Sequence, residues 1–452
     1  MYMVINNNTN KKINITIIGS GSAGLLTSLI FKNKIPNSDV SIIHDKNTPV
    51  IGVGESTLGS FSNMLTNYAG IDIYDFNNNV KPVTKYGIWF DFGKKEFHFP
   101  FDNSFDFEYN NKLLPIGFDY DGGNFGNTPF SVKMIKNDTP FSKETGAVHI
   151  DNKKLLKYLE KIAIERGIKF IDDKITSIQK EGDVILSLNK KYKADYFIDC
   201  SGFKPLLSKE KFHSYEDILV NDKALFFRTK TKNNIRSYTK SSTMNSGWLW
   251  EIDHSQGYTG NGYVYSSKYI SDEDALKEVQ KKLGIEITNY RVIPFKTGRL
   301  EKHWVGNVIT IGNADGFVEP LEATSLLVIL FLAKDVASII KYGDNKGDLI
   351  DRYNIFVNKY YDTIKDFISM HFCFNDKLDT KYWKDYKKRI KLIPKDSLGY
   401  DILKYYLINN THIKFLSHVY NDINPYGIDG WYSVLRGLIP DKKSRDNILS
   451  KL

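Results

Sequence analysis

The sequence predicts a mixed α/β fold: a Rossmann-like dinucleotide-binding unit with an inserted β-sheet region and a C-terminal helical subdomain. A β-branched apolar run at residues 15–18 leads into a glycine-rich turn and then into a segment of helical character. Apolar runs that end in glycine turns recur at residues 196–202 and 308–316. From Leu349 onward the apolar residues keep helical spacing, so we expect the C-terminal quarter to be helical.

The first glycine-rich turn reads Gly19-Ser20-Gly21-Ser22-Ala23-Gly24, with the spacing Gly-x-Gly-x-x-Gly. In this pattern the first glycine allows a tight turn, the second lets backbone N–H groups approach a pyrophosphate, and the third lets helix and strand pack closely. The helix N-terminus then faces the phosphates with its partial positive charge. Structural glycine turns are common, but the strand before this one and the helix after it favour a nucleotide site.

A second strand of the same βαβ unit is expected at residues 40–43. An acidic residue about 20 positions after the glycines usually binds the ribose. Asp45 lies close to that position, although His44 is also a candidate for the end of the strand. The sequence leaves both residues open as ribose contacts.

Two further segments precede the first insertion. Residues 51–57 form a glycine-rich connection unlike a simple loop. In residues 85–90 the side chains are expected to alternate between the two faces of a strand, and this places Lys85 and Trp89 on one face.

No flexible linker is visible, so we expect the parts to pack as one body. Residues 1–345 are predicted to form the nucleotide-binding module, and residues 346–452 a helical subdomain that caps the substrate. Two substrate-facing insertions are expected in the module. The one at about 91–148 is rich in Gly, Asn, Asp and aromatic residues, and the one at about 215–295 is mainly β.

Composition excludes several classes of function. The 452 residues carry a formal charge of +9, but the lysines are interleaved with Asp and Glu, which argues against a nucleic-acid-binding surface. Two cysteines, Cys200 and Cys373, cannot form a disulfide framework, and no Cys/His spacing resembles a metal site.

The sequence also predicts a cytoplasmic protein without a membrane partner. We find no signal peptide, because the first apolar run is the strand described above. The longest uninterrupted apolar run, residues 326–333, is too short to span a bilayer.

Five sequence blocks occur in the order typical of the flavin-dependent halogenases of the tryptophan-halogenase type. From about residue 15 to residue 440 the chain resembles that family. The blocks are Gly19–Gly24, Gly52-Val53-Gly54-Glu55-Ser56-Thr57, the strand at Lys85, Trp248-Leu249-Trp250-Glu251-Ile252 and Glu319-Pro320-Leu321-Glu322-Ala323-Thr324. Asp366-Phe367-Ile368, His371-Phe372 and Trp431-Tyr432 resemble the family's C-terminal helices.

The resemblance implies a halogenase that depends on reduced FAD and O2. In the family, a halide is oxidised at the flavin to hypohalous acid, which passes through a tunnel to a lysine beside an aromatic substrate. Electrophilic halogen then replaces a ring hydrogen. Because the chain has no second glycine fingerprint for NADPH, we expect a separate flavin reductase to supply FADH2.

The resemblance also assigns residues to roles. Lys85 would position or carry the halogen, Glu322 would stabilise the cationic arene or accept its proton, and Thr324 with Ser325 would bind the halide. Trp248 and Trp250 would lie near the flavin and keep the substrate away from it. The residues expected to bind FAD are Gly19, Gly21, Ser22, Ala23, Gly24, His44 or Asp45, Gly54, Glu55, Ser56 and Asp315.

Each role has a simpler structural alternative. Thr324 could cap a helix, and Glu322 could complement the dipole of a helix's first turn. Trp248 and Trp250 could pack in the core, and Lys85 could be solvated. The order of the blocks favours the functional roles.

Three departures from the family's pattern concern halide and substrate. Asp253 stands where the tryptophan signature has proline, and 323–325 reads Ala-Thr-Ser where chloride-using members have Ser-Thr-Gly. A serine in place of glycine changes the volume and backbone freedom of the halide site, so bromide or iodide becomes plausible.

Phe99-Pro100-Phe101 replaces the His-Pro-Phe of tryptophan-specific members. We therefore expect a small aromatic substrate other than free tryptophan, in a pocket built from Phe99, Pro100, Phe101, Trp431 and Tyr432.

Two rival functions remain open. A flavin-dependent aromatic hydroxylase would share the nucleotide fold but would lack Lys85 and the paired tryptophans in these contexts. A non-catalytic flavin-binding relative is disfavoured by the joint presence of Lys85 and Glu322.

Overall fold

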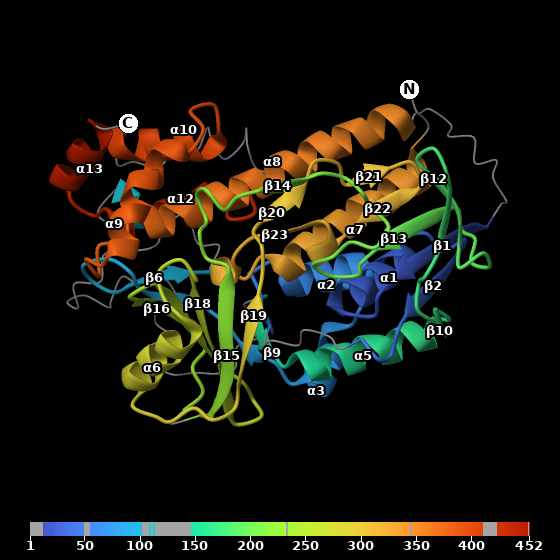
Figure 1. Ribbon diagram of the computed structural model, residues 1–452, viewed down its shortest axis with the longest axis horizontal. Helices are drawn as coiled ribbons and strands as arrows, with labels where there is room; N and C mark the ends of the chain where they lie inside the picture. Colours follow the sequence, from blue (N-terminus) through green and yellow to red (C-terminus); the bar gives the residue numbers. More distant parts are fainter. Residues whose placement is uncertain are drawn as a thin grey trace.

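The computed structural model describes residues 12–48, 55–101, 108–109, 112–113, 146–231, 234–343, 346–409, 423–450 and 452. Gly54 and most of the insertion expected at 91–148 lie outside these residues. The described chain forms two large sheets with helices around them (Figure 1). The predicted mixed α/β fold class is confirmed.

The first large sheet has six strands in the order β10-β2-β1-β13-β22-β21. Its strands are parallel except for the edge pair β21/β22. Ile17, Ile42 and Ile198 of its central strands are fully buried, as expected for a parallel sheet covered on both faces. The strands are β1 (Ile13–Ile18), β2 (Ser38–His44), β10 (Lys169–Asp172), β13 (Tyr196–Asp199), β21 (Trp304–Val305) and β22 (Val308–Thr310).

The helix after the glycine turn, α1 (Ser22–Lys34), packs against α7 (Ser325–Tyr342), α2 (Phe61–Ala69) and α5 (Asn152–Glu165). In Figure 1 these helices lie close to the six-stranded sheet, and α3 (Ile73–Val80) packs on α5. Helix α1 begins at Ser22, within the glycine turn, and so includes the third glycine of that turn.

The second large sheet has seven strands in the order β19-β15-β18-β17-β16-β5-β6. Within it, β17 turns Trp248 and Trp250 toward the main core and Leu249 toward a second core beneath α6 (Asp272–Leu283). The strands are β5 (Gly87–Asp91), β6 (Phe97–Pro100), β15 (Lys223–Lys230), β16 (Thr239–Met244), β17 (Gly247–Asp253), β18 (Tyr258–Tyr265) and β19 (Tyr290–Pro294).

Helix α6 interrupts the region expected to be mainly β. Its boundaries follow from local chemistry: the Ser271 side chain accepts a hydrogen bond from the Asp274 N–H, and Gly284 ends the helix in a left-handed conformation. Acidic residues in the first turn and lysines in the last turn complement the helix dipole. These signals were present in the sequence, but the neighbouring strands obscured them.

Small sheets connect the larger parts. The expected strand at 85–90 begins only at Gly87, and Lys85 lies in the link after β4, where its backbone N–H donates to the Ala147 carbonyl at 2.9 Å. The short strands are β3 (Glu55–Ser56), β4 (Val83–Thr84) and β9 (Val148–Ile150); β14 (Phe212–Ser214), β20 (Gly298–Leu300) and β23 (Gly316–Phe317); and the hairpins β7 (Glu108–Tyr109) with β8 (Lys112–Leu113) and β11 (Ile178–Glu181) with β12 (Val184–Leu188).

The long helix α8 (Lys346–Cys373) runs across the molecule in Figure 1 and joins the two parts expected from the sequence. It contacts α7, β20 and β21 in the module and also α9, α10 and α12 beyond it. The remaining helices are α9 (Lys381–Lys387), α10 (Leu398–Asn409), α12 (Gly427–Leu438) and α13 (Lys442–Leu449). The described residues also form the 3-10 helices η2 (Gly312–Ala314), η3 (Pro320–Glu322) and η4 (Lys388–Leu392).

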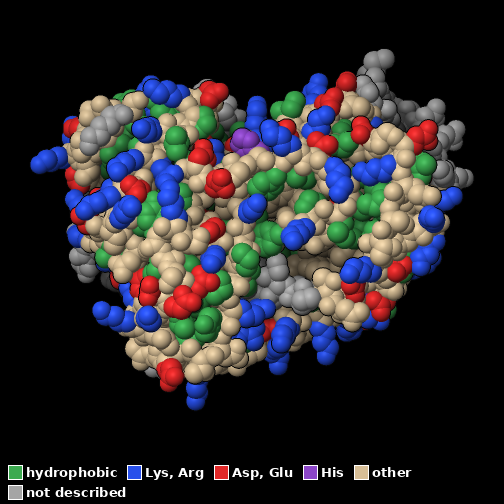
Figure 2. All heavy atoms as spheres, viewed as in Figure 1, with side chains coloured by type: hydrophobic (Ala, Val, Ile, Leu, Met, Phe, Trp, Pro, Cys, Tyr) green, Lys and Arg blue, Asp and Glu red, His purple; other side chains and the backbone are tan. Residues whose placement is uncertain are grey.

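The surface shows mixed charge on the face drawn in Figure 2, where lysine and arginine side chains are spread among aspartate and glutamate. Within the described ranges, no helix has the length and apolarity needed to cross a bilayer. The same residues contain no group of three or more His, Cys, Asp or Glu that could hold a metal ion.

Candidate active site

A cavity of about 590 Å³ lies at the carboxyl ends of β1, β2 and β13. This is the edge of a parallel sheet at which nucleotides bind in doubly wound folds. Ser20, Gly21 and Ser22 line it from the glycine turn, Cys200–Lys204 line it from the end of β13, and Asn313 lines it from η2.

The three glycines meet the demands expected of a dinucleotide turn. Gly19 has φ +104°, and a Cβ there would lie 2.6 Å from the Cys200 carbonyl oxygen. A Cβ on Gly24 would lie 1.9 Å from the Gly19 oxygen, so only glycine lets α1 pack this closely. Nothing lies within 4 Å of the Cβ position of Gly21, which leaves the N-terminus of α1 open toward the cavity.

Both ribose candidates line the cavity. His44 ends β2, and its Nδ1 is hydrogen-bonded to the Ser20 hydroxyl at 2.9 Å. The Asp45 carboxylate instead stabilises its own turn, because it accepts from the Asn47 N–H at 2.9 Å and from the Thr48 hydroxyl at 3.1 Å. Each residue already has a local partner, so the choice between them stays open.

Trp248 and Trp250 line the same cavity from β17. Their ring centroids are 5.8 Å apart, and both side chains are buried. The Trp248 indole N–H donates to Glu319 Oε2 at 3.0 Å, and the Asn221 side chain donates to the same oxygen at 2.8 Å. The pair therefore packs in the core and faces the cavity at once.

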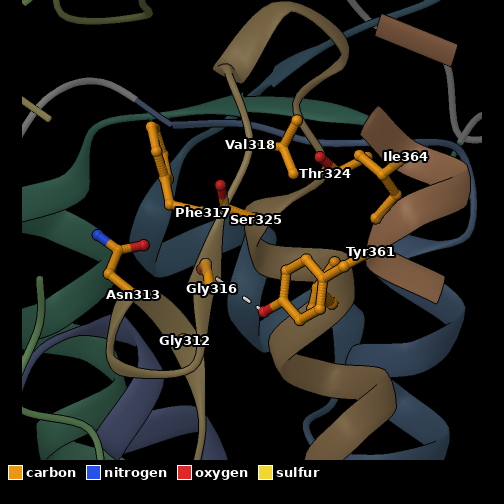
Figure 3. A pocket seen from close by; sticks show the side chains of 10 residues that line it. Gly312, Asn313, Gly316, Phe317, Val318, Thr324, Ser325, Tyr361 and Ile364 are labelled. Carbon is orange, nitrogen blue, oxygen red and sulfur yellow. Dashed lines mark hydrogen bonds between the residues drawn. The ribbon is translucent and has the colours of Figure 1, made fainter. Parts of the chain in front are cut away.

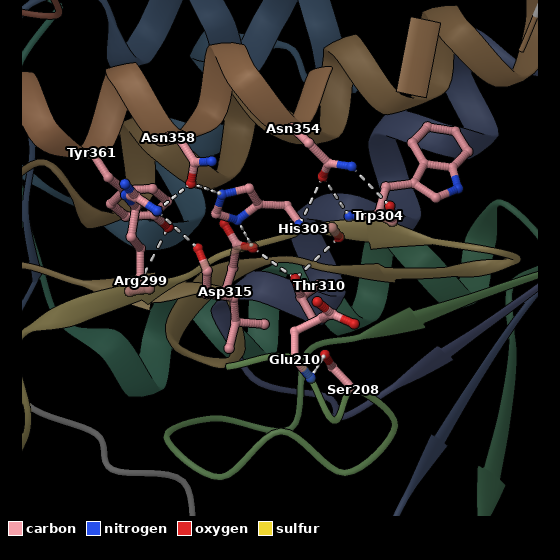
Figure 4. A network of polar contacts seen from close by, with 12 residues as sticks. Ser208, Glu210, Arg299, His303, Trp304, Thr310, Asp315, Asn354, Asn358 and Tyr361 are labelled. Carbon is pink, nitrogen blue, oxygen red and sulfur yellow. Dashed lines mark hydrogen bonds and ion pairs between the residues drawn. The ribbon is translucent and has the colours of Figure 1, made fainter. Parts of the chain in front are cut away.

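Asp315, another residue expected to bind FAD, lies in a buried polar network. Its carboxylate Oδ1 lies 2.6 Å from His303 Nδ1 and 2.6 Å from the Thr310 hydroxyl, in a buried polar network beneath α8 (Figure 4). Asn358 of α8 contacts the other ring nitrogen of His303 at 3.1 Å. Asn313, and not Asp315, lines the cavity, so Asp315 supports this turn from behind.

A smaller cavity of about 20 Å³ adjoins the first one, since Asn313, Phe317 and Ser325 line both. Thr324 and Ser325 stand at the start of α7, where the first N–H groups of a helix have no intrahelical partner. Figure 3 shows Tyr361 and Ile364 on the α8 side of this cavity. The volume suits one small ion or one water molecule.

Thr324 stands at the N-cap position of α7, and Glu322 lies in the short 3-10 turn before it. The Thr324 side chain makes no capping hydrogen bond to α7. Glu322 lies in η3, three positions before α7 begins, and is fully buried. Ala323 between them adopts φ 56°, a left-handed conformation uncommon for residues other than glycine.

Lys85 is fully buried, contrary to the solvated alternative. Its Nζ donates to the Thr57 carbonyl at 3.0 Å and lies 4.6 Å from the centroid of the Phe101 ring. Burial lowers the pKa of Lys85 to about 7, and the nearby Glu322 carboxylate opposes this shift. A neutral amine is therefore accessible at physiological pH.

Glu322 approaches α8. Its Oε1 lies 2.8 Å from Nε2 of His371, which is also fully buried. The His371 ring lies between Phe90, at 5.1 Å between centroids, and Phe367, at 4.9 Å.

Aromatic residues expected to line a substrate pocket cluster on the same side. Phe99 contacts Phe101 at 5.2 Å between centroids and Phe367 at 6.4 Å, and Trp431 contacts Phe367 at 4.9 Å. Tyr432 points elsewhere and packs edge-on against Tyr406 of α10. For Glu55 and Pro100 the structure describes the backbone alone.

Of the described residues, Lys85 and Glu322 line neither of the two cavities. The large cavity is lined by Leu321 and Ala323, the chain neighbours of Glu322. It is also lined by Ser56, which precedes Thr57, the residue whose carbonyl accepts the hydrogen bond from Lys85.

Sequence reasoning missed three polar residues of this region. Glu319 belongs to the same short motif as Glu322, and its place in that motif was a usable signal. His371 lies one helical turn after Phe367 in the last part of α8, where every residue is buried and several are polar, so its sequence position alone did not mark it. No sequence pattern marked His303 as the partner of Asp315.

Comparisons with known proteins agree with this geometry. A model of the tryptophan halogenase family matches residues 14–400. The chain is 28% identical to tryptophan 7-halogenase RebH of Lentzea aerocolonigenes, over 83% of this chain and 78% of that protein. It is 26% identical to tryptophan 6-halogenase SttH of Streptomyces toxytricini, over 84% of this chain and 82% of that protein. The crystal structure of MibH, a "lathipeptide tryptophan 5-halogenase", superposes with a TM-score of 0.83 at 26% identity, covering 98% of this chain and 91% of that one.

Proposed function

The chain belongs to the tryptophan halogenase family, and we propose that it is an FADH2- and O2-dependent halogenase of electron-rich aromatic compounds other than free tryptophan. In this proposal, hypohalous acid formed at the flavin delivers electrophilic halogen through Lys85. The observation that carries it is the buried Lys85 amine, which lies beside an aromatic cluster and close enough to Glu322 for their charges to interact.

The large cavity has the features that FAD requires. The open N-terminus of α1 at Gly21 suits a pyrophosphate, and His44 and Asp45 stand where a ribose would be recognised. Ser56, Trp248 and Trp250 line the cavity and would flank the ring system. When bound and reduced, FAD would supply the two-electron oxidation of halide by O2.

Thr324 and Ser325 would hold the halide through backbone N–H groups at the start of α7. The small cavity adjoins the large one, so a halide there would sit beside the flavin. Ser325 adds a side chain where chloride-using members have glycine, and the changed volume and backbone freedom of the site make bromide or iodide a candidate beside chloride.

Hypohalous acid would pass from the large cavity, past Ser56 and Ala323, to the neighbouring Lys85. A desolvated amine with a lowered pKa is a nucleophile that can form a haloamine or hold hypohalous acid by hydrogen bonding. Either route turns a diffusible oxidant into a positioned electrophile.

Glu322 would stabilise the cationic ring that forms when the halogen adds, and then accept the ring proton. Phe99, Phe101 and Trp431 surround this region and would present flat surfaces to an aromatic substrate. A separate reductase would supply FADH2.

The test is an assay of the full chain with FAD, a flavin reductase, O2 and each halide, against a panel of arenes analysed by mass spectrometry. The panel contains free tryptophan, tryptophan within a peptide, indoles and phenols. We expect halide-dependent addition of halogen to at least one arene, with free tryptophan a poor substrate. Oxygen insertion without halide would instead indicate a hydroxylase, and no reaction at all would indicate a non-catalytic flavin-binding protein.

A further inference from the structure

A chain of three polar side chains links the wall of the large cavity to a buried histidine. Ser56 and Thr239 both line the cavity, and their hydroxyl oxygens lie 3.2 Å apart. The Thr239 hydroxyl is also hydrogen-bonded to Nε2 of His149 at 2.9 Å. His149 is 1% exposed and lines neither of the two cavities. The chain therefore starts at the cavity and ends in the interior of the protein.

Two sheets bring these side chains together. In a small sheet, Ser56 of β3 and His149 of β9 are direct cross-strand partners, so their side chains share one face. Thr239 begins β16 of the seven-stranded sheet, and the neighbouring strand β17 carries Trp248 and Trp250. The chain thus ties the strand of Ser56 to the sheet that carries both tryptophans of the cavity.

The His149 imidazole is neutral. Burial, together with the nearby charge of Lys85, holds the pKa of His149 well below its ordinary range. A neutral ring has one N–H and one lone pair, so Nε2 either donates to Thr239 or accepts from it. Nδ1 has no hydrogen-bond partner among the described residues, so Thr239 is the polar partner that orients the ring.

Either direction of donation leaves Ser56 one hydrogen-bonding position for a ligand. If Nε2 accepts, Thr239 donates to the ring and Ser56 donates to Thr239, so Ser56 keeps lone pairs for the cavity. If Nε2 donates, Thr239 donates to Ser56, and the Ser56 proton is free. In both cases the bond to Thr239 selects one of the staggered rotamers of Ser56. A β-branched threonine suits this task, because its own side chain has few rotamers.

The next residue, Thr57, is held in a different way. Its hydroxyl accepts from the Val148 N–H at 2.8 Å and donates to the Val148 carbonyl at 3.1 Å. The Thr57 carbonyl in turn accepts from Lys85. Consecutive residues of β9 therefore hold consecutive residues at the end of β3. Val148 holds Thr57 beside Lys85, and His149 acts through Thr239 on Ser56 at the cavity.

We propose that Thr239 and His149 are positioning residues for the flavin: they fix the Ser56 hydroxyl on the wall of the large cavity, where it meets the bound FAD. This inference rests on the proposed function, which puts FAD in that cavity. A preorganised hydroxyl costs less ordering when the ligand binds, so breaking the chain should weaken FAD binding. Lys85 should keep its partner, because Thr57 is anchored to Val148.

Matched substitutions test each member of the chain. Thr239→Val keeps the shape of the side chain and removes the hydroxyl, whereas Thr239→Ser keeps the hydroxyl. His149→Phe keeps a ring and removes Nε2, whereas the amide of His149→Gln can occupy the position of Nε2. Because His149 does not line the cavity, an effect on FAD that appears in His149→Phe and is restored in His149→Gln is transmitted through Thr239.

We expect Thr239→Val, His149→Phe and Ser56→Ala each to raise the Kd of FAD by roughly 2- to 10-fold, the range for loss of one hydrogen bond. Titration of the protein with oxidised FAD, followed by fluorescence, measures this change. Thr239→Ser and His149→Gln should stay close to the parent. In a Ser56→Ala background, Thr239→Val should cause no further loss, because Thr239 acts through Ser56.

The visible absorption spectrum of bound FAD gives a readout that a purely structural role would not move. The loss of an oriented hydroxyl should shift the flavin bands in the same direction in Thr239→Val, His149→Phe and Ser56→Ala. The bands should return to their parental positions in Thr239→Ser and His149→Gln.

Thr57→Val is the contrasting variant, because it removes the hydroxyl that anchors Thr57 beside Lys85. It should lower the ratio of halogenated arene to hypohalous acid and leave the spectrum of bound FAD as in the parent. Thr239→Val should do the reverse, with a shifted FAD spectrum and a parental ratio.

A parental Kd and a parental spectrum in both Thr239→Val and His149→Phe would overturn the inference and leave the halogenase proposal standing. A further loss on adding Thr239→Val to Ser56→Ala would also overturn it, since Thr239 would then act on FAD without Ser56. A parent protein that binds FAD but halogenates no arene would overturn the proposed function alone. A parent protein that binds no FAD would overturn both.

Discussion

The indole ring of Trp250 fills the space that a side chain at position 262 would occupy. Trp250 on β17 pairs directly with Gly262 on β18, and a Cβ built on Gly262 would lie 1.9 Å from the Trp250 ring. The absence of a side chain on β18 therefore lets the indole lie flat against the sheet and form a wall of the large cavity.

Gly262→Ala should push Trp250 into the cavity and cost about 1–3 kcal/mol of unfolding free energy, the usual range for overpacking. FAD affinity should fall as well, because the displaced indole would occupy part of the cavity. Thermal unfolding and flavin titration measure the two effects. Gly347→Ala is the matched control, because nothing lies within 4 Å of that Cβ position. Adding Trp250→Phe to Gly262→Ala should restore part of the lost stability, because the smaller ring leaves room for the added methyl group. An unchanged Tm in Gly262→Ala would contradict the close packing of Trp250 on Gly262.

Glu319→Gln should change how stability depends on pH. Burial raises the pKa of Glu319 to about 7, so this group stabilises the fold below pH 4.5 and loses that contribution as pH rises through 7. A shift of this size corresponds to roughly 3 kcal/mol. Glutamine keeps an acceptor for Trp248 and Asn221 without a buried charge.

The variant should therefore unfold at higher urea concentration than the parent at pH 8 and close to the parent at pH 5. Glu319→Ala, which leaves both donors unpaired, should be less stable at either pH. Equal differences between Glu319→Gln and the parent at the two pH values would refute the shifted pKa.

Halogen transfer should depend on the protonation of Lys85. With a pKa of about 7, the neutral amine fraction rises from about one tenth at pH 6 to about nine tenths at pH 8. If the neutral amine forms the haloamine, the ratio of halogenated arene to hypohalous acid rises over this range. Measuring that ratio at fixed FADH2 supply tests the point. If the ratio of halogenated arene to hypohalous acid falls as pH rises, the protonated Lys85 ammonium is the active form and acts as a hydrogen-bond donor.

Ser325→Ala should change halide selectivity. The Ser325 side chain lines both cavities, and its hydroxyl can donate to an anion in the smaller one (Figure 3). Chloride has a higher charge density than bromide and loses more when a donor is removed, so the ratio of bromide to chloride incorporation should rise several-fold. Competition assays with both halides measure it. If Ser325→Ala incorporates bromide and chloride in the same ratio as the parent, the halide does not bind beside the Ser325 hydroxyl.

Local sequence signals predicted the nucleotide-binding part well. The β-branched run has a local strand preference, and the spacing of Gly19, Gly21 and Gly24 reflects backbone requirements of the turn itself. Both signals depend on neighbouring residues alone, so they predict the turn without knowledge of the rest of the chain. The alternation of Trp248 and Trp250 likewise predicted a shared face, and the structure places both on one core.

Contacts between distant segments could not be predicted in this way. Lys85 was assigned to a strand, yet it lies before β5 and is buried by segments near Thr57 and Phe101. Asp315, which is expected to bind FAD, is paired with His303, and no local pattern marked that partner. His371 approaches Glu322 only because α8 crosses η3, and no local pattern contains that crossing.

The most direct test of the central claim is to measure hypohalous acid and halogenated arene side by side in Lys85→Ala. We expect the variant to consume FADH2, O2 and halide and to release hypohalous acid at the parental rate. Arene halogenation should fall by about 100-fold or more, as expected when covalent or positioned delivery is lost. Arene halogenation at the parental rate would contradict the account, because the halogen would then reach the substrate without the amine.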